Sequence, residues 1–365
     1  MALSSALSGS WHPLRLTGTP MPPNLLLLCK ILAAAILATG HFRILPDPFL
    51  PFIPGLDALV APQVFKTTLQ SVAVLSAVAL LCNRTVRASA LVLGSCLLVG
   101  VVSSKAYYGN NKTFVGLSLV LIGLSDFDTK PYLFRWQFSL VYFGAALNKL
   151  LDPDWQSGLF FDYWATAKVK NAVYLNLAPW LPELVLGKIM CWGTITAEFA
   201  VSLALFVPRL VPLALGLNVL FQVGLLEFTG NTFTLFFYAM NAATLAFVVW
   251  PERLRIEYDP GRGGILRTVL RLFDPDGLQH WLPSAETRYL TLLHGGRAYL
   301  GIAAVRRLLF YSPVFWLGAT VLLAQMPSPF GRRVLVAAAL ALALVPFGLA
   351  GLVRRHKPEA PTLFS

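Results

Sequence analysis

The stretch KTTLQSVAVLSAVALLCNRTVRASALVLGSCLLVGVVSSK (residues 66–105) decides the fold class. It contains two apolar runs, 66–82 and 88–105, separated by the short basic turn NRTVR at 83–87. A helix of about 20 residues, within a range of about 17 to 25, crosses the hydrocarbon core of a bilayer. The stretch therefore predicts two neighbouring membrane helices joined by a tight turn.

The same pattern recurs over the first 250 residues. Of the 365 residues, 56% are hydrophobic and 13% are charged, which is about half the charge of an ordinary soluble domain. We therefore expect an N-terminal tail (1–23) followed by an all-α polytopic membrane helix bundle of about eight transmembrane helices (24–251). The remaining six runs fall near 24–42, 113–127, 134–150, 184–207, 210–228 and 231–250.

The charge distribution sets the expected partner and orientation. The net charge of +12 comes mainly from the region after residue 250, where fourteen Lys and Arg face seven Asp and Glu. Basic flanks of membrane helices follow the positive-inside rule and attract anionic lipid, so we expect the lipid bilayer as partner and no nucleic acid. The sequence identifies no protein partner.

Three short basic loops, at 83–87, 127–135 and 208–209, fall on one side of an eight-span bundle. This side is then cytoplasmic. We expect a multi-pass protein of the inner or plasma membrane, with the N-terminus and the region after Pro251 in the cytoplasm. Lys149 lies at the outer end of the fifth helix.

Three regions depart from the spanning pattern. Residues 151–183 are rich in aromatic residues, Asp and Pro and are too polar to span, which predicts an interfacial segment that caps the bundle. Residues 252–311 alternate strand-like and helix-like segments, the pattern of a small α/β module, and SAETRYLTLL (284–293) is one of the expected helices. Residues 312–365 hold the apolar runs 315–326 and 334–353, as a two-helix hairpin or a single C-terminal span.

Cysteine and metal chemistry are not indicated. All four cysteines lie inside apolar runs and no CxxC pair exists, so we expect neither a disulfide framework nor a metal site. They are Cys29, Cys82, Cys96 and Cys191.

Ionisable residues within apolar runs are costly, and each is a functional candidate. Lys30, Lys149 and Lys188 lie near helix ends, where the alternative is an anchor that snorkels to the membrane surface. Glu198 lies in the middle of TITAEFAVSLAL, where its carboxylate must be protonated, paired or directed to a hydrated cavity. A structural hydrogen bond and a role in a site are equal alternatives for Glu198.

The stretch YFGAALNKLLDPDWQSG (142–158) resembles the signature of the vitamin K-dependent γ-carboxylase and its bacterial HTTM relatives. That signature has Tyr-Phe, small residues, a lysine, Leu-Asp-x-Asp-Trp and a glycine. YYGNNKTFVGL (107–117), Glu198 and FQVGLLEFTGNTFTLFFY (221–238) agree with the family as well. The resemblance covers residues 24 to 250.

The resemblance implies a chemistry for the bundle. In the carboxylase, the lysine that matches Lys149 is the base that deprotonates a reduced quinone, so the resemblance implies a reduced quinone as cofactor and Lys149 as catalytic base. The pocket candidates are Asn110, Asn111, Lys112, Tyr142, Asp152, Asp154, Trp155, Glu198 and Glu227.

The chain also departs from the family. Lys112 stands in NNKTF where the family usually has histidine, and Leu226 or Glu227 stands where the carboxylase has a histidine before the eighth helix. All five histidines of the chain lie outside the matching motifs. Two hypotheses remain: a quinol-linked membrane enzyme, and a non-catalytic membrane scaffold that binds lipid or quinone.

The C-terminal module has a resemblance of its own. IEYDPGRGGILRTVLRLFDPDG (256–277) and GGRAYLGIAAVRRLL (295–309) are similar to the DCC family of thioredoxin-like thiol-disulfide oxidoreductases. The two cysteines of that family fall at about Arg262 and Ile265 in this chain. Because thiol-disulfide exchange requires a thiolate, we expect a degenerate, redox-inactive module that serves stability or docking.

Overall fold

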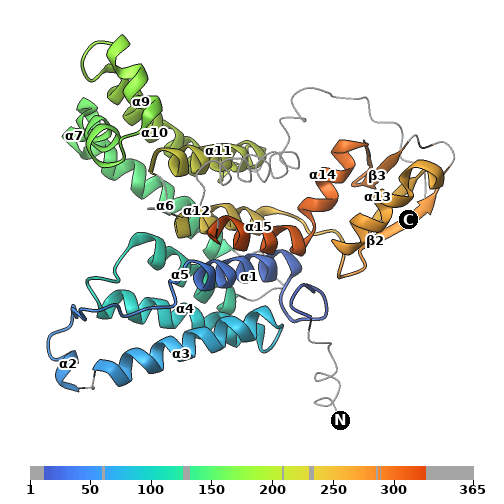
Figure 1. Cartoon of the computed structure of the whole chain (residues 1–365), viewed down its shortest axis with the longest axis horizontal. Coiled ribbons are helices and arrows are strands. Elements are labelled where there is room, and N and C mark those ends of the chain that lie inside the picture. Colours follow the sequence, from blue (N-terminus) through green and yellow to red (C-terminus); the bar gives the residue numbers. More distant parts are fainter. Residues whose placement is uncertain are drawn as a thin grey trace.

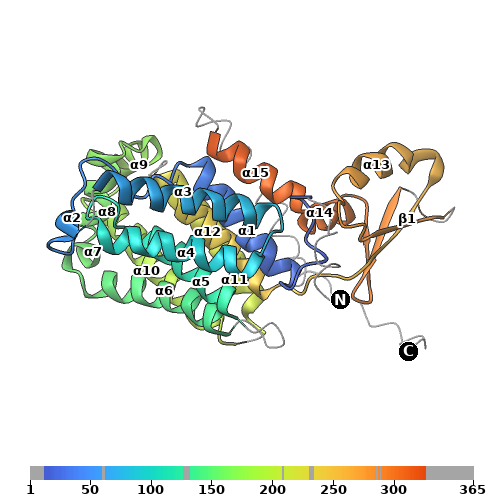
Figure 2. The same ribbon diagram turned by 90° about the horizontal axis from the view of Figure 1, so that it is seen from below.

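The computed structural model describes residues 12–59, 62–125, 132–207, 209–229, 234–284, 287 and 289–325. Within these residues the chain is mostly helical, with a small mixed four-stranded sheet in its C-terminal part. Figures 1 and 2 show a helical bundle on one side and the sheet with its helices on the other.

Eight helices coincide with the eight predicted apolar runs, because the pattern that predicts them is local in the sequence. A 3-10 turn, η4 (Thr244–Phe247), extends the last of them. The eight are α1 (Pro23–Ala38), α3 (Pro62–Leu81), α4 (Val86–Ser103), α5 (Asn110–Leu124), α6 (Tyr132–Leu151), α10 (Val185–Ala204), α11 (Val211–Thr229) and α12 (Thr234–Ala243).

Only some helices have the length and apolar composition of a membrane span. Among the described residues α3 and α4 qualify, and α14 (Ile302–Phe310) with α15 (Pro313–Gln325) qualifies as one pair bent by 78°. The prediction of about eight spans is wrong by this criterion, which gives two or three. The other bundle helices are shorter, or carry ionisable side chains as α6 and α10 do.

Helix α1 forms the centre of the bundle. It is buried from Leu25 to Ile36 and packs against α3, α12 and α15. A helix that is apolar on all sides is stable only when other elements or lipid surround it. Within this run Lys30 is the single basic or acidic residue, and it is fully buried.

Short helical pieces form a cap at the end of the bundle remote from the sheet (Figure 2). No piece exceeds six residues, so none can span a membrane. We call residues 152–184 the cap. Its pieces are α7 (Pro153–Ser157), α8 (Leu159–Tyr163), the π-helical turn η2 (Trp164–Lys168), α9 (Ala172–Leu177) and the 3-10 turn η3 (Ala178–Trp180). At the same end lies the short helix α2 (Leu56–Leu59).

The sheet has the order β2-β1-β3-β4. Helix α13 (Pro260–Leu272) connects β1 (Leu254–Tyr258) to the parallel strand β2 (Gln279–Pro283), while β3 (Leu290–His294) and β4 (Arg297–Leu300) form an antiparallel hairpin. The prediction of a helix at SAETRYLTLL is wrong, because Leu290–His294 forms strand β3, which pairs with β1 on one side and with β4 on the other. The C-terminal run 334–353 lies outside the described residues.

Candidate functional site

The ammonium of Lys149 meets the carboxylate of Glu198 inside the bundle. The Lys149 Nζ donates to both Oε1 and Oε2 of Glu198, each at 2.7 Å. The side chain of Lys149 is 20% exposed and that of Glu198 is 6% exposed. A charge-assisted contact of this kind is stronger than a neutral hydrogen bond, and its strength increases where water is excluded.

The packing of α6 against α10 sets this pairing. The two helices contact each other along their lengths, and the Ser139 hydroxyl donates to the Ser202 carbonyl at 2.9 Å. Small polar residues allow helices to approach closely and join them within an apolar bundle. The antiparallel register then places Lys149, in the last turn of α6, opposite Glu198.

The start of the cap covers the lysine. The Lys149 Nζ lies 5.1 Å from the centroid of the Trp155 ring, within the range of a cation–π interaction. Trp155 stacks on Phe160 (4.4 Å, 19°), and Phe160 stacks on Trp164 (6.1 Å, 15°). The ion pair therefore borders a layer of three nearly parallel aromatic rings.

Asp152 and Asp154 shape this turn and do not join the ion pair. The Asp152 carboxylate accepts from the Asp154 backbone N–H at 2.9 Å and so caps α7. Asp154 lies exposed in the first turn of the same helix, where its charge is favourable.

A second buried polar group begins two turns earlier on α6. The Tyr142 hydroxyl donates to the Asn218 side chain, and the Gln222 amide donates to the Tyr142 oxygen at 2.8 Å. Asn218 in turn donates to the Met240 carbonyl at 3.2 Å, which connects α6, α11 and α12. Glu227, also on α11, has a side chain outside the described part of the structure.

Lys112 belongs to a different cluster. Its Nζ donates to the Tyr107 carbonyl at 2.5 Å and lies 4.1 Å from the Tyr107 ring centroid. The Asn111 side chain accepts from the Lys112 N–H at 2.8 Å, and Asn110 is exposed at the start of α5. No contact among the described residues joins this cluster to the Lys149–Glu198 pair.

The sequence reasoning missed His41, which borders the Lys112 cluster. The Tyr107 hydroxyl donates to the His41 carbonyl at 2.8 Å, and Thr39 Oγ1 lies 2.6 Å from His41 Nδ1. Burial, reinforced by the charge of Lys112, lowers the pKa of His41 to about 4. Its position just after the first apolar run could have placed it at this end of the bundle, although it lies 71 residues before Lys112.

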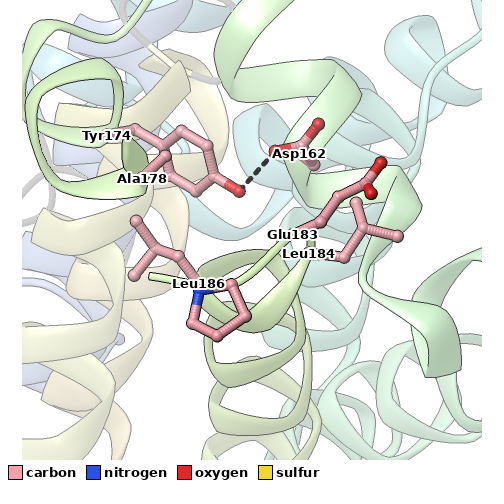
Figure 3. A pocket seen from close by; sticks show the side chains of 7 residues that line it. Asp162, Tyr174, Ala178, Glu183, Leu184 and Leu186 are labelled. Carbon is pink, nitrogen blue, oxygen red and sulfur yellow. Dashed lines mark hydrogen bonds between the residues drawn. The ribbon is translucent and has the colours of Figure 1, made fainter. Parts of the chain in front are cut away.

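The cap also contains a cavity of about 220 Å³. Figure 3 shows the Tyr174 hydroxyl directed at Asp162, to which it donates at 2.8 Å. Glu183 supplies a second carboxylate to the lining, and Leu184 and Leu186 add apolar side chains. Tyr174 comes from α9 and Asp162 from α8, so their hydrogen bond fixes the two cap helices to each other.

The positions in the module that match the DCC cysteines carry no thiol chemistry. Arg262 lies 5.9 Å from the Tyr289 ring centroid, and Ile265 is exposed. Asp259 caps α13 by accepting from the Gly261 N–H at 2.8 Å. The Tyr258 hydroxyl accepts from Arg267, so the retained Tyr-Asp pair has structural partners.

Taken together, the described residues place the Lys149–Glu198 ion pair at the edge of an aromatic layer. Within the described ranges no three His, Cys, Asp or Glu side chains are close enough to bind a metal ion. No protein-family model, curated protein or solved structure matches this chain, so the family resemblance rests on the sequence motifs.

Proposed function

We propose that this chain is an HTTM-like membrane protein, related to the vitamin K-dependent γ-carboxylase, whose working centre is the Lys149–Glu198 pair. In this proposal the bundle lies in the membrane, with α3 and α4 as its spanning helices and the cap on the outer side. The bundle accepts a reduced quinone or a similar lipid-soluble phenol, and Lys149 takes up its proton. The contact of Lys149 Nζ with both oxygens of Glu198 at 2.7 Å carries the proposal.

The pair supplies the base without leaving a lone charge in the bundle. An isolated ammonium in a medium of low dielectric constant is costly, and a matching carboxylate offsets that cost. Transfer of the proton from Lys149 to Glu198 leaves a neutral amine and a neutral acid. The Lys149 amine can then accept a proton from a bound hydroxyl, while Glu198 holds the first proton beside it.

The surroundings of Lys149 suit a planar ligand. The flat face of Trp155 lies beside the ammonium, and aromatic rings stack on one another in offset or edge arrangements. The partial exposure of Lys149 leaves its side chain accessible. A reduced quinone, when bound, supplies the hydroxyl and the redox chemistry.

The test is oxygen-dependent turnover of reduced quinones by the purified protein in nanodiscs. We expect Lys149→Ala to abolish turnover and Glu198→Gln to reduce it strongly. Lys149→Arg keeps the positive charge but cannot act as a base near neutral pH, so it should also be inactive. Lys188→Ala, an exposed lysine at the start of α10, is the matched control and should retain turnover. Equal rates for the wild type and Lys149→Ala would remove the proposed base.

The second hypothesis is a non-catalytic scaffold that binds lipid or quinone. The observation in its favour is that Lys112 and Asn111 form a separate cluster and bring no second polar group to Lys149. A scaffold binds the quinone in equilibrium dialysis without consuming oxygen, whereas the enzyme does both.

For the C-terminal module we propose a redox-inactive, thioredoxin-like domain of the DCC type. The parallel β1–α13–β2 unit followed by the β3–β4 hairpin and α14 supports this fold. Purified protein should leave a disulfide substrate unreduced in the absence of added thiol. Reduction of that substrate would contradict the proposal.

A further inference from the structure

The cap displays large, exposed apolar side chains on two of its helices and in the turn that follows them. On α8, Leu159 and Tyr163 are both exposed, and on α9 the same is true of Val173 and Leu177. Each pair is spaced four residues apart, so its members share one side of their helix. Trp180, in the turn after α9, is 85% exposed.

This pattern continues onto the bundle. Leu147 and Leu151 form an exposed pair with the same spacing in the last two turns of α6, directly before the cap. Ile189 and Trp192 are exposed in the first turns of α10, directly after it. Exposed apolar side chains therefore also lie on the helices directly before and after the cap.

The backbone of the cap is suited to surroundings with little water. The Asp152 and Asn171 side chains accept from the N–H groups of Asp154 and Tyr174, which caps α7 and α9. Between the helices, the Asn171 N–H donates to the Ala165 carbonyl at 2.8 Å. Segments in contact with lipid must satisfy their backbone groups internally, and helical pieces with capped starts do so.

The cap is also held firmly to the bundle. Gly158, at the junction of α7 and α8, packs so closely on α10 that an added Cβ would lie 2.4 Å from the Lys188 nitrogen. The Trp192 indole donates to the Gln156 carbonyl at 3.3 Å. The apolar pairs are therefore held on the outside by the packing of the cap on α10.

We propose that the exposed apolar side chains of the cap, Leu159, Tyr163, Val173, Leu177 and Trp180, form a lipid-contacting surface in the interfacial region of the bilayer. Pieces of three to six residues cannot cross the membrane and therefore lie along it. Exposed Trp and Tyr favour the headgroup level, where the ring is apolar and its polar edge is hydrated. The cap then covers the Lys149–Glu198 end of α6 and α10 from the lipid side. The inference rests on the membrane location of the bundle and is independent of quinone chemistry.

A spin label on α9 tests this surface in the full-length chain, reconstituted in phosphatidylcholine nanodiscs. Leu177→Cys reports on the proposed surface, and Thr268→Cys is the water-facing control, because Thr268 is an exposed polar position on α13 of the module, outside the bundle. A Cys82→Ser background removes the half-buried native thiol. For each spin label, the frequency of collisions with oxygen, which partitions into lipid, is compared with the frequency of collisions with a water-soluble nickel chelate.

We expect oxygen collisions to exceed nickel collisions at position 177 and the order to reverse at position 268. Higher nickel accessibility at 177 would overturn the proposal in favour of a water-facing cap. A spin label at position 177 that is protected from both oxygen and nickel, with a spectrum broadened by a second label nearby, would overturn the proposal in favour of contact with a second copy of the chain. Quinol turnover is measured on the same samples, so failure of this inference and failure of the proposed enzyme activity give different results.

Native Trp180 provides a measurement that does not depend on a label. Brominated phosphatidylcholine should quench part of the tryptophan fluorescence, and Trp180→Phe should reduce the quenched part. An unchanged quenched part in Trp180→Phe would contradict contact between Trp180 and lipid.

Discussion

Lys30 and Lys149 both lie within apolar helices, but the free-energy cost of burying their ammonium groups is offset by different partners. Lys30 is fully buried in α1 and donates to the carbonyls of Pro13 and Arg15, the latter at 2.8 Å. Lys149 is partly exposed and is paired with a carboxylate. Carbonyl dipoles stabilise an ammonium but cannot accept its proton, whereas Glu198 can do both. The comparison identifies Lys30 as structural and Lys149 as the candidate for chemistry.

The role of Lys30 is to hold the N-terminal segment. That segment also reaches the module, where the Asp276 carboxylate accepts from the N–H groups of Leu16 and Thr17 at 2.9 and 3.0 Å. Lys30 was expected to snorkel to the membrane surface or to act in a site. The snorkelling prediction is wrong, because partners come from the preceding 20 residues and bury the side chain.

Removal of the carboxylate gives the largest expected effect on stability. Glu198→Ala leaves the Lys149 ammonium without its partner, which should reduce the free energy of unfolding by about 3–5 kcal/mol. The double variant Lys149→Met with Glu198→Leu should recover most of this loss, because no charge remains. Chemical unfolding in detergent measures both. A loss in the double variant equal to the sum of the losses in Lys149→Met and Glu198→Leu alone would show that the pair carries no coupling energy.

The close contact of the cap gives the next largest effect. Gly158 has φ +86° and an added Cβ would overlap the Lys188 backbone. Gly158→Ala should therefore reduce the free energy of unfolding by about 2–4 kcal/mol, from the left-handed conformation and the overlap. It should also displace Trp155 from Lys149 and lower quinol turnover. Gly144→Ala on α6 is the control, since no atom lies within 4 Å of its added Cβ.

A smaller effect is expected for the structural lysine. Lys30→Met keeps the length of the side chain but leaves the Pro13 carbonyl without the Lys30 donor and the Arg15 carbonyl with the Asn83 amide alone, at 3.0 Å, a loss of about 1–3 kcal/mol. Limited proteolysis should then cleave the first 20 residues faster, while quinol turnover per folded molecule stays at the wild-type level. A loss of turnover equal to that of Lys149→Ala would break the distinction between the two lysines.

The sequence predicted the helices better than their contacts. Apolar runs are local, and all eight became helices. The strand at Leu290–His294 depends on pairing with β1 and β4, which no local pattern contains. Lys149 and Glu198 were separate candidates, and their pairing across 49 residues required the register of α6 and α10. Lys112 was expected near Lys149, but the local fold of 107–112 turns its ammonium to Tyr107.

The smallest expected effect concerns His41, which lies beside the Lys112 cluster. Its pKa of about 4 in the folded protein lies below the value of about 6.5 for an unperturbed histidine. Between pH 6.5 and 4 the unfolded chain binds the additional proton, so stability should fall as the pH falls through this window and stay unaffected above it. We expect a loss of about 1 kcal/mol in the free energy of unfolding, since His41 is partly accessible to solvent.

His41→Asn removes the titration of this side chain. If His41→Asn kept the pH dependence of the wild type, another group would be its cause. Lys112→Met should reduce the same dependence by removing the neighbouring charge. Such a result would make Lys112 a modulator of His41 and leave Lys149, of the three lysines Lys30, Lys112 and Lys149, as the one paired with a carboxylate.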